Sequence, residues 1–251
     1  MKKFRKTVLA VTNLIITFAG IHCFYQYTED VKDSDVSGWS ATEDIKEPAL
    51  VPLEIIPPRD FLHAEPFNRS MRPVPNLEQN NGYDKANEPF LVPAGTINVA
   101  LGKPVSSSDD NPVIGTIERV NDGKKDAPTH DGFVELDPGL QHITIDLLQI
   151  CEIYAIVVWH SFFIGPVYFD VVVQVSNDLN FSKDVRTLFN NDSDNSSKLG
   201  IGQDENYRER RQGKLINANG VQARYVRLYS NGNSGNEMNH YIKIEVHGKP
   251  A

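Results

Sequence analysis

The C-terminal part of the chain alternates short runs of apolar, mostly β-branched residues with clusters of Gly, Asn, Asp and Ser. In three of these runs, 142–147, 225–229 and 241–246, every second residue is apolar. This period of two predicts half-buried β-strands, and the turn residues between them predict a sheet protein. The side chains expected to face a core are Ile143, Ile145, Leu147, Val226, Leu228, Ile242, Ile244 and Val246.

Two other runs complete the pattern. Residues 153–159 are almost continuously apolar, as in a strand that is covered on both faces, and residues 168–176 mix continuous and alternating patterns. No stretch has a helical period long enough to supply the crossover helices of a parallel sheet. From about Asn98 onward the pattern therefore predicts an all-β fold, a jelly-roll β-sandwich of roughly 150 residues.

The N-terminal residues have a different composition from the predicted sheet region. A basic segment, 1–6, precedes the largely apolar run 7–24, as in a secretory signal peptide. Thr17 and Ala19 could stand before a cleavage site, whereas Asn13 and His22 weaken the alternative of a spanning helix. We expect 1–24 to be a signal peptide or a membrane anchor. Either one places the remainder outside the cytoplasmic membrane, as a secreted, periplasmic or outwardly anchored protein.

Residues 25–90 are expected to form a proline-rich linker or extended arm before a sandwich domain at 91–251. Nine of the fifteen prolines lie between Pro48 and Pro93, and proline removes backbone donors that helices and central strands need. Two alternatives remain open for the arm. It is a solvated linker, or its residues 53–67 dock on the domain through apolar side chains such as Ile55, Ile56 and Phe61.

Composition and charge exclude several classes of function. The 251 residues carry a net charge of −8, which disfavours nucleic acid as a partner. Cys23 and Cys151 are the two cysteines, too few for a zinc site or a disulfide framework. The sequence has no G-x-S-x-G, H-E-x-x-H or Walker motif, and its histidines lack metal-binding spacing. We predict a binding protein rather than an enzyme, with membrane contact only through the N-terminal segment.

Seven short motifs occur in the order found in one family of binding domains. They are 98–108 (NVALGKPVSSS), Asn121-Asp-Gly123, 143–147 (ITIDL), 157–159 (VVW), 173–176 (VQVS), 223–228 (ARYVRL) and 244–248 (IEVHG). Together they resemble the coagulation factor 5/8 type C, or discoidin, domain. The resemblance covers 98–248 and implies a galactose-binding-like β-sandwich. It also implies cell adhesion or another binding role, with sugars, phospholipid headgroups or proteins held by loops at one end.

No cysteine stands near either end of the matched region, so the chain is more similar to bacterial members, which resemble family-32 carbohydrate-binding modules. That resemblance implies a structural Ca²⁺ with ligands at Asp122, Asp126 and Thr129. Lys243 stands where the resemblance would place a glutamate, and its positive charge opposes calcium. We therefore expect calcium to stabilise the domain little. The loop 190–197 offers oxygen ligands at alternate positions, either as a second calcium loop or as a solvated loop.

The resemblance places the ligand between the 160–167 loop and the 231–240 loop. Hydrogen-bonding candidates are His160, Asn231, Asn233, Asn236 and His240, and Phe162 or Phe163 would supply an apolar face. Each has a structural alternative: His160 as a strand-end residue, the two Phe as an inward plug, and the asparagines as turn residues. The residues 205–211 mix both charges and are expected to form a solvated face, and Arg224 and Arg227 are expected to be structural.

The predicted function is an exported, non-catalytic module that recognises carbohydrate through these loops. One alternative is a structural or protein-interaction module that meets another protein of the cell envelope. The other is binding of lipid headgroups through Phe162 and Phe163.

Overall fold

The computed structural model describes residues 48–58, 73–79, 88–125, 132–161 and 165–251. It also describes two short strands of the N-terminal segment, β1 (Thr17–Phe18) and β2 (Ile21–His22), which pair with each other in antiparallel fashion. The chain divides into two units, 1–46 and 47–251. None of the helices in the described residues is long and apolar enough to cross a membrane. The signal or anchor role of 1–24 stays a prediction.

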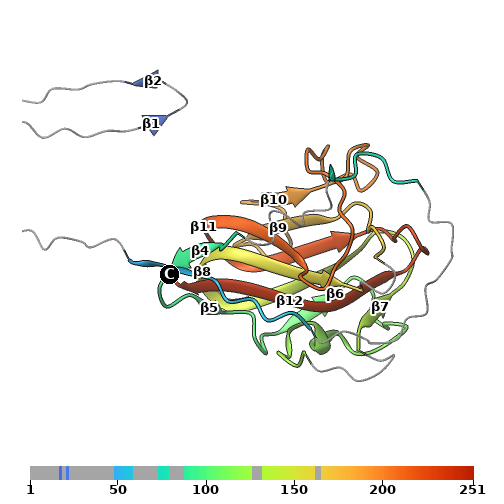
Figure 1. Ribbon diagram of the computed structural model, residues 1–251, viewed down its shortest axis with the longest axis horizontal. Helices are drawn as coiled ribbons and strands as arrows, with labels where there is room; N and C mark the ends of the chain where they lie inside the picture. Colours follow the sequence, from blue (N-terminus) through green and yellow to red (C-terminus); the bar gives the residue numbers. More distant parts are fainter. Residues whose placement is uncertain are drawn as a thin grey trace, which may run out of the picture. The chain divides into compact units, whose positions relative to one another are not determined.

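The second unit is an all-β antiparallel sandwich, as predicted (Figure 1). Its elements are β3 (Leu50–Pro52), β4 (Leu91–Pro93), β5 (Ile97–Asn98), β6 (Val105–Ser107), the 3₁₀ helix η3 (Ile117–Asn121), β7 (Val134–Leu136), β8 (Gln141–His160), β9 (Val172–Ser176), β10 (Arg186–Asn190), β11 (Lys214–Ser230) and β12 (Asn239–Pro250). The main sheet has the order β10-β9-β11-β8-β12-β5. β6 pairs with β8, and β7 pairs with β12.

Two long strands, β8 and β11, pair with each other along most of their length. Register shifts interrupt this ladder at 217–221 and at 223–225, and such β-bulges bend a strand and increase its twist. On one side of the bulges the two strands border β6 and β9, and on the other side β8 borders β12. The same pair of strands therefore contributes to both parts of the sandwich.

The main core follows the predicted alternation closely. The inward residues of 142–147 and of 225–229 are buried together with Ile244 and Val246 of β12. Ile242 is the exception, because it packs with Val157 and Trp159 in a second cluster instead. A register shift between Tyr241 and Lys243 explains this difference, since a slip of one residue reverses which face a side chain occupies.

The apolar run 153–159 is covered on both faces, as predicted. Ile156 and Val158 point into the main core, whereas Val157 and Trp159 belong to the second cluster. The Trp159 indole Nε1 donates to the carbonyl of Arg211 at 3.0 Å. Gly213 has φ +72°, and a Cβ at this glycine would lie 2.6 Å from the indole. The close approach of the backbone to Trp159 therefore requires glycine there.

The described parts of the arm contact the sandwich. β3 pairs with β4, and the Ile55 side chain packs on the second cluster. Farther along, Asn206 donates its backbone N–H to the carbonyl of Asn76 at 2.9 Å and accepts from Glu78 N–H at 2.8 Å. Residues 59–72 and 80–87 lie outside the described residues. The domain boundaries themselves stay predictions.

Candidate functional site

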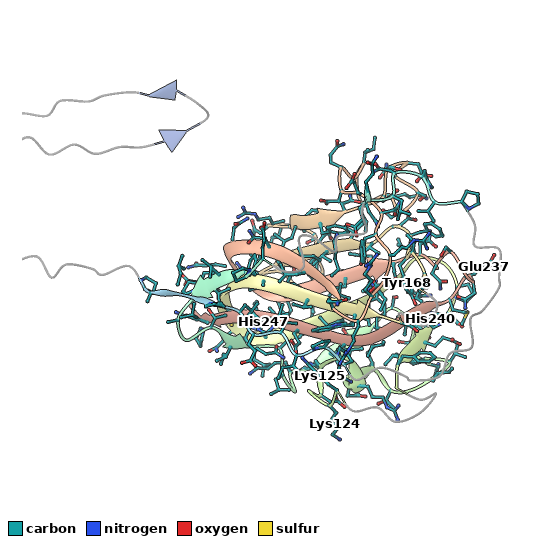
Figure 2. All side chains as sticks on the ribbon, in the orientation of Figure 1. Lys124, Lys125, Tyr168, Glu237, His240 and His247 are labelled. Carbon is teal, nitrogen blue, oxygen red and sulfur yellow. The ribbon has the colours of Figure 1, made fainter. Side chains whose placement is uncertain are left out.

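Two segments, 165–171 and 231–236, lie side by side at one end of the sandwich; the first begins in the predicted ligand loop 160–167 and runs beyond it, and the second lies within the predicted loop 231–240. Phe169 N–H donates to the carbonyl of Gly232 at 3.1 Å, and Asn231 N–H donates back to the carbonyl of Phe169 at 2.9 Å. Ser234 N–H donates to the carbonyl of Val167 at 2.8 Å. Figure 2 shows Tyr168, Glu237 and His240 together in this region. The backbone bonds hold the two segments in a defined relative position.

The asparagines of the 231–240 loop divide between turn and surface. Asn233 is buried, and its side-chain N–H donates to Asn236 Oδ1 at 2.8 Å and to the carbonyl of Met238 at 2.9 Å. Its Oδ1 accepts from the backbone of Gly235 at 2.8 Å. The amide of Asn233 is thus used within the turn, whereas Asn236 is exposed. Their role as ligand contacts stays a prediction, and Asn236 is the better placed of the two.

Asn231 connects this end to a residue that sequence analysis did not single out. Its Nδ2 donates to Asp170 Oδ2 at 2.8 Å, and the Ser196 hydroxyl donates to the same oxygen at 2.8 Å. Asp170 carries no recognisable sequence signal for a site, because it falls inside the largely apolar run 168–176. It has φ +50°, which turns the chain just before β9.

Three carboxylates gather beside Asn231. Ligand atoms of Asp170, Asp192 and Asp194 lie within 4.8 Å of one another, so this group could hold a calcium ion. Burial raises the pKa of Asp170, and the negative charges of Asp192 and Asp194 add to this effect. Two of the three residues come from the 190–197 loop that the sequence indicated as a possible calcium loop. The third, Asp170, is brought there only by the fold.

The loop at Asp122 differs from this acidic group, because the positively charged side chain of Lys243 already lies beside its carboxylate. Lys243 Nζ lies 3.0 Å from Asp122 Oδ1 and also donates to the carbonyl of Arg119. Burial lowers the pKa of Lys243, although the carboxylate of Asp122 opposes this shift. Asp126 and Thr129 lie outside the described residues. Their role as calcium ligands stays a prediction, and the position of the Lys243 ammonium beside Asp122 opposes it.

His160 is fully buried, at 0% exposure. Its Nδ1 lies 2.6 Å from Glu209 Oε1, and the Glu209 side chain is equally buried. The expectation of a solvated face at 205–211 is therefore wrong for Glu209, because its carboxylate turns inward to the imidazole. A direct ligand contact by His160 stays a prediction, and the burial of its ring argues against one.

His240 belongs to a second pair of the same kind. Its Nε2 lies 2.9 Å from Glu135 Oε2, and its Nδ1 lies 2.9 Å from the Tyr168 hydroxyl. The Tyr168 ring stacks on His160 with ring centroids 4.4 Å apart. Two Glu–His pairs, both beneath the candidate loops, are thus joined through Tyr168. Neither glutamate carries a local sequence signal, because both reach the histidines only through long-range contacts.

The remaining predicted site residues, Phe162 and Phe163, lie outside the described residues. Asn239, by contrast, was not predicted and is fully buried. Its Oδ1 accepts from the Ser230 hydroxyl and from Gly232 N–H, both at 2.8 Å. Its Nδ2 donates to the carbonyls of Asp137 and Gly139 at 2.8 and 3.0 Å. Asn239 therefore ties the 231–240 loop to the segment before β8.

The chain was compared with known proteins. No protein-family model matches it, and no curated protein matches its sequence. Among solved structures, it is similar to the chitosan-binding module 1 of a chitosanase/glucanase from Paenibacillus sp. IK-5, with 18% identity and a TM-score of 0.43. That match covers 60% of this chain and 98% of the other.

Two further matches are CBM32 modules. One, from Clostridium perfringens, is in complex with GlcNAc-α-1,4-galactose; it has 16% identity and a TM-score of 0.44, over 62% of this chain and 96% of the other. The other is the CBM32 of AlyQ in complex with 4,5-unsaturated mannuronic acid, with 15% identity and a TM-score of 0.42, over 57% and 92%. Some other matched chains are larger enzymes, of which this chain spans a small part.

Proposed function

We propose that this chain is an exported, non-catalytic module that binds carbohydrate at the end of the sandwich where segments 165–171 and 231–236 meet. One observation carries the proposal. At this end Asn231, Asp170 and Asn236 offer amide and carboxylate groups from two segments that backbone hydrogen bonds hold together. Converging polar groups on a rigid base are what recognition of a small polar ligand requires.

The chemistry suits a polyhydroxyl ligand. Asn236 Oδ1 accepts from Asn233 and Met238, and Asn231 Nδ2 donates to Asp170 Oδ2. The Asn236 amino group as donor, and Asn231 Oδ1 and Asp170 Oδ1 as acceptors, are the atoms that can match sugar hydroxyls. The asparagine Asn233 and the buried imidazoles beneath keep the surface side chains in place rather than contacting the sugar. Binding in this arrangement is weak for a single sugar, because each neutral hydrogen bond contributes only about 0.5–1.5 kcal/mol.

A glycan array probed with the purified exported protein tests the proposal. The sugars held by the matched modules, together with glucosamine oligomers, supply the first probes. For a sugar that binds, Asn231→Ala is expected to weaken affinity about three- to tenfold, the loss of about one hydrogen bond. Asn180→Ala, an exposed asparagine in the turn after β9, is the matched control and is expected to bind normally.

Two outcomes would contradict the proposal. An array on which no glycan is bound, combined with flotation of the protein on vesicles of anionic lipid, would favour the lipid-headgroup alternative. Sugar binding that Asn231→Ala leaves at full strength would move the site away from this end of the sandwich. Intact mass of the exported protein reports separately whether the N-terminal segment is cleaved.

A further inference from the structure

We propose that His240 is a proton sensor in a buried lock, and that acidification loosens the two candidate loop segments by breaking their common support. The lock consists of two Glu–His pairs, Glu135–His240 and Glu209–His160, joined by Tyr168. This inference goes beyond the proposed function, because the lock concerns the free protein and its test needs no ligand.

The lock collects side chains from separate parts of the fold. Glu135 lies on β7, His160 near the end of β8, and His240 near the start of β12, while Glu209 precedes β11. Tyr168 lies between them: its ring stacks on His160, and its hydroxyl reaches His240. Because all five side chains are nearly or fully removed from solvent, the polar atoms that are hydrogen-bonded to one another depend on these bonds in place of water.

The contacts assign the proton positions on His240. Glu135 as a carboxylate only accepts hydrogen bonds, so His240 Nε2 carries the hydrogen at the 2.9 Å contact. In a neutral ring Nδ1 is then an acceptor, and the Tyr168 hydroxyl donates to it. Burial raises the pKa of Tyr168 far above its ordinary value, so this hydroxyl keeps its proton. The neutral form of His240 is thus fully hydrogen-bonded.

A second proton on His240 must go to Nδ1, and this reverses the bond to Tyr168. The Tyr168 oxygen would have to accept, and its own proton would have to turn to the carbonyl of Ser161, which lies 3.4 Å away. The new charge would also face the His160 ring, which burial deprives of water. The protonated lock therefore has one poorer hydrogen bond and a buried positive charge whose desolvation the Glu135 carboxylate does not fully offset.

The groups that face His240 also indicate that its protonated form is disfavoured. They are Glu135 from β7, Tyr168 from the 165–171 segment and the His160 ring from β8, with the Phe133 ring packed edge-on at 5.3 Å. Burial lowers the pKa of His240 below its ordinary value, and the His160 ring adds to this, although Glu135 opposes it. Below about pH 6.5 the unfolded or opened chain therefore takes up a proton more readily than the closed lock.

Tyr168 connects the protonation of His240 to the two candidate segments, 165–171 and 231–236. Its neighbours Val167 and Phe169 make the backbone bonds to Ser234 and Gly232 that hold the two segments together. A shift of the Tyr168 side chain moves the residue between these two bonds. Loosening of the lock is thus expected to open the same amides that fix the candidate binding surface.

Hydrogen exchange by NMR on the full chain tests this inference. From about pH 7.5 to about pH 5, after correction for intrinsic rates, the amides of Phe169, Asn231 and Ser234 are expected to exchange about three- to tenfold faster. The amide of Val99, which donates to the carbonyl of Val246 in another part of the sandwich, is the internal control and is expected to stay constant. Imidazole nitrogen shifts are expected to show His240 protonated at Nε2 at neutral pH, with a pKa below 6.5.

Two variants separate the sensor from a merely structural role. His240→Gln removes the titrating group, so the three amides are expected to lose their pH response. Tyr168→Phe keeps the stacked ring but lacks the hydroxyl, so His240 should still titrate while the amides no longer follow it. Wild-type amides that stay constant while His240 titrates would overturn the inference, as would a pH response that persists in His240→Gln. If His240→Gln fails to fold, Tyr168→Phe decides the question.

Discussion

The ammonium of Lys243 is predicted to neutralise the Asp122 carboxylate, as a bound cation would. Its removal is therefore expected to destabilise the domain. The Lys243 side chain is 5% exposed and lies 3.0 Å from Asp122, whose side chain is 27% exposed. Breaking a fully buried ion pair costs about 3–5 kcal/mol. Because water can still reach Asp122, and because Lys243 is costly to bury, we expect Lys243→Ala to lower the free energy of unfolding by about 1–3 kcal/mol.

Urea denaturation measures this change. Lys124→Ala is the matched control: this neighbouring lysine is exposed, and its removal should change the stability by less than about 0.5 kcal/mol. A double-mutant cycle with Asp122→Asn isolates the pair, with a coupling energy of about 0.5–3 kcal/mol expected.

Calcium provides the second half of this test. In an Asp194→Asn variant, which lacks one carboxylate of the other candidate calcium group, EDTA should leave the Tm nearly unchanged, since Lys243 already neutralises Asp122. Lys243→Glu would instead place two carboxylates together, and its Tm should rise on addition of calcium. A Tm of the Asp194→Asn variant that falls by several degrees in EDTA, or a Lys243→Ala variant as stable as the wild type, would refute the reasoning.

Three further predictions concern other parts of the sandwich. Burial lowers the pKa of His142 to about 4, with Arg227 adding to the shift, so the unfolded chain binds this proton first as the pH falls. Stability should therefore decline from about pH 6.5 to about pH 4, and His142→Gln should reduce that decline in urea titrations at several pH values. Ile55→Ser should lower the free energy of unfolding by about 1–2 kcal/mol, because Ile55 packs on the second cluster. Ile56→Ser, at a side chain 61% exposed, should change it little. Equal losses of stability in the two variants would contradict arm docking through Ile55. Arg224→Met should lower the stability only slightly, and less at high salt, because water reaches both members of its bidentate pair with Asp146.

The strands of the sandwich were predictable because their signal is local. Alternation along 142–147 and 225–229 names the buried face without reference to any partner strand, and the continuous run at 153–159 indicates cover on both faces. Ile242 shows where this reasoning ends. Its side chain changes face because of a register shift against β8, and a register is a property of two strands rather than of one.

Part of the candidate site was predictable for the same reason. The asparagines of 231–240 and the two loops were visible in the sequence, and the structure brings segment 231–236 together with 165–171, of which only 165–167 belongs to the predicted 160–167 loop. It also gives each residue a role that the sequence left open: Asn233 is used within its turn, Asn231 binds Asp170, and His160 is buried. Exposure and partnership depend on the surrounding chain, so residue type alone does not decide them.

What the sequence by itself determined is therefore the fold class, the strands and the loops that carry polar side chains. Only the tertiary structure decided which polar groups are paired. Glu209 is separated from His160 by 49 residues and Glu135 from His240 by 105, so no local pattern connects them. Lys243 shows the difference between what the sequence determines and what only the tertiary structure decides. Its charge was readable as an obstacle to calcium, but the contact with Asp122 exists only because the turn after η3 folds against β12. Burial removes water from such groups, and the fold alone supplies the partners that replace it.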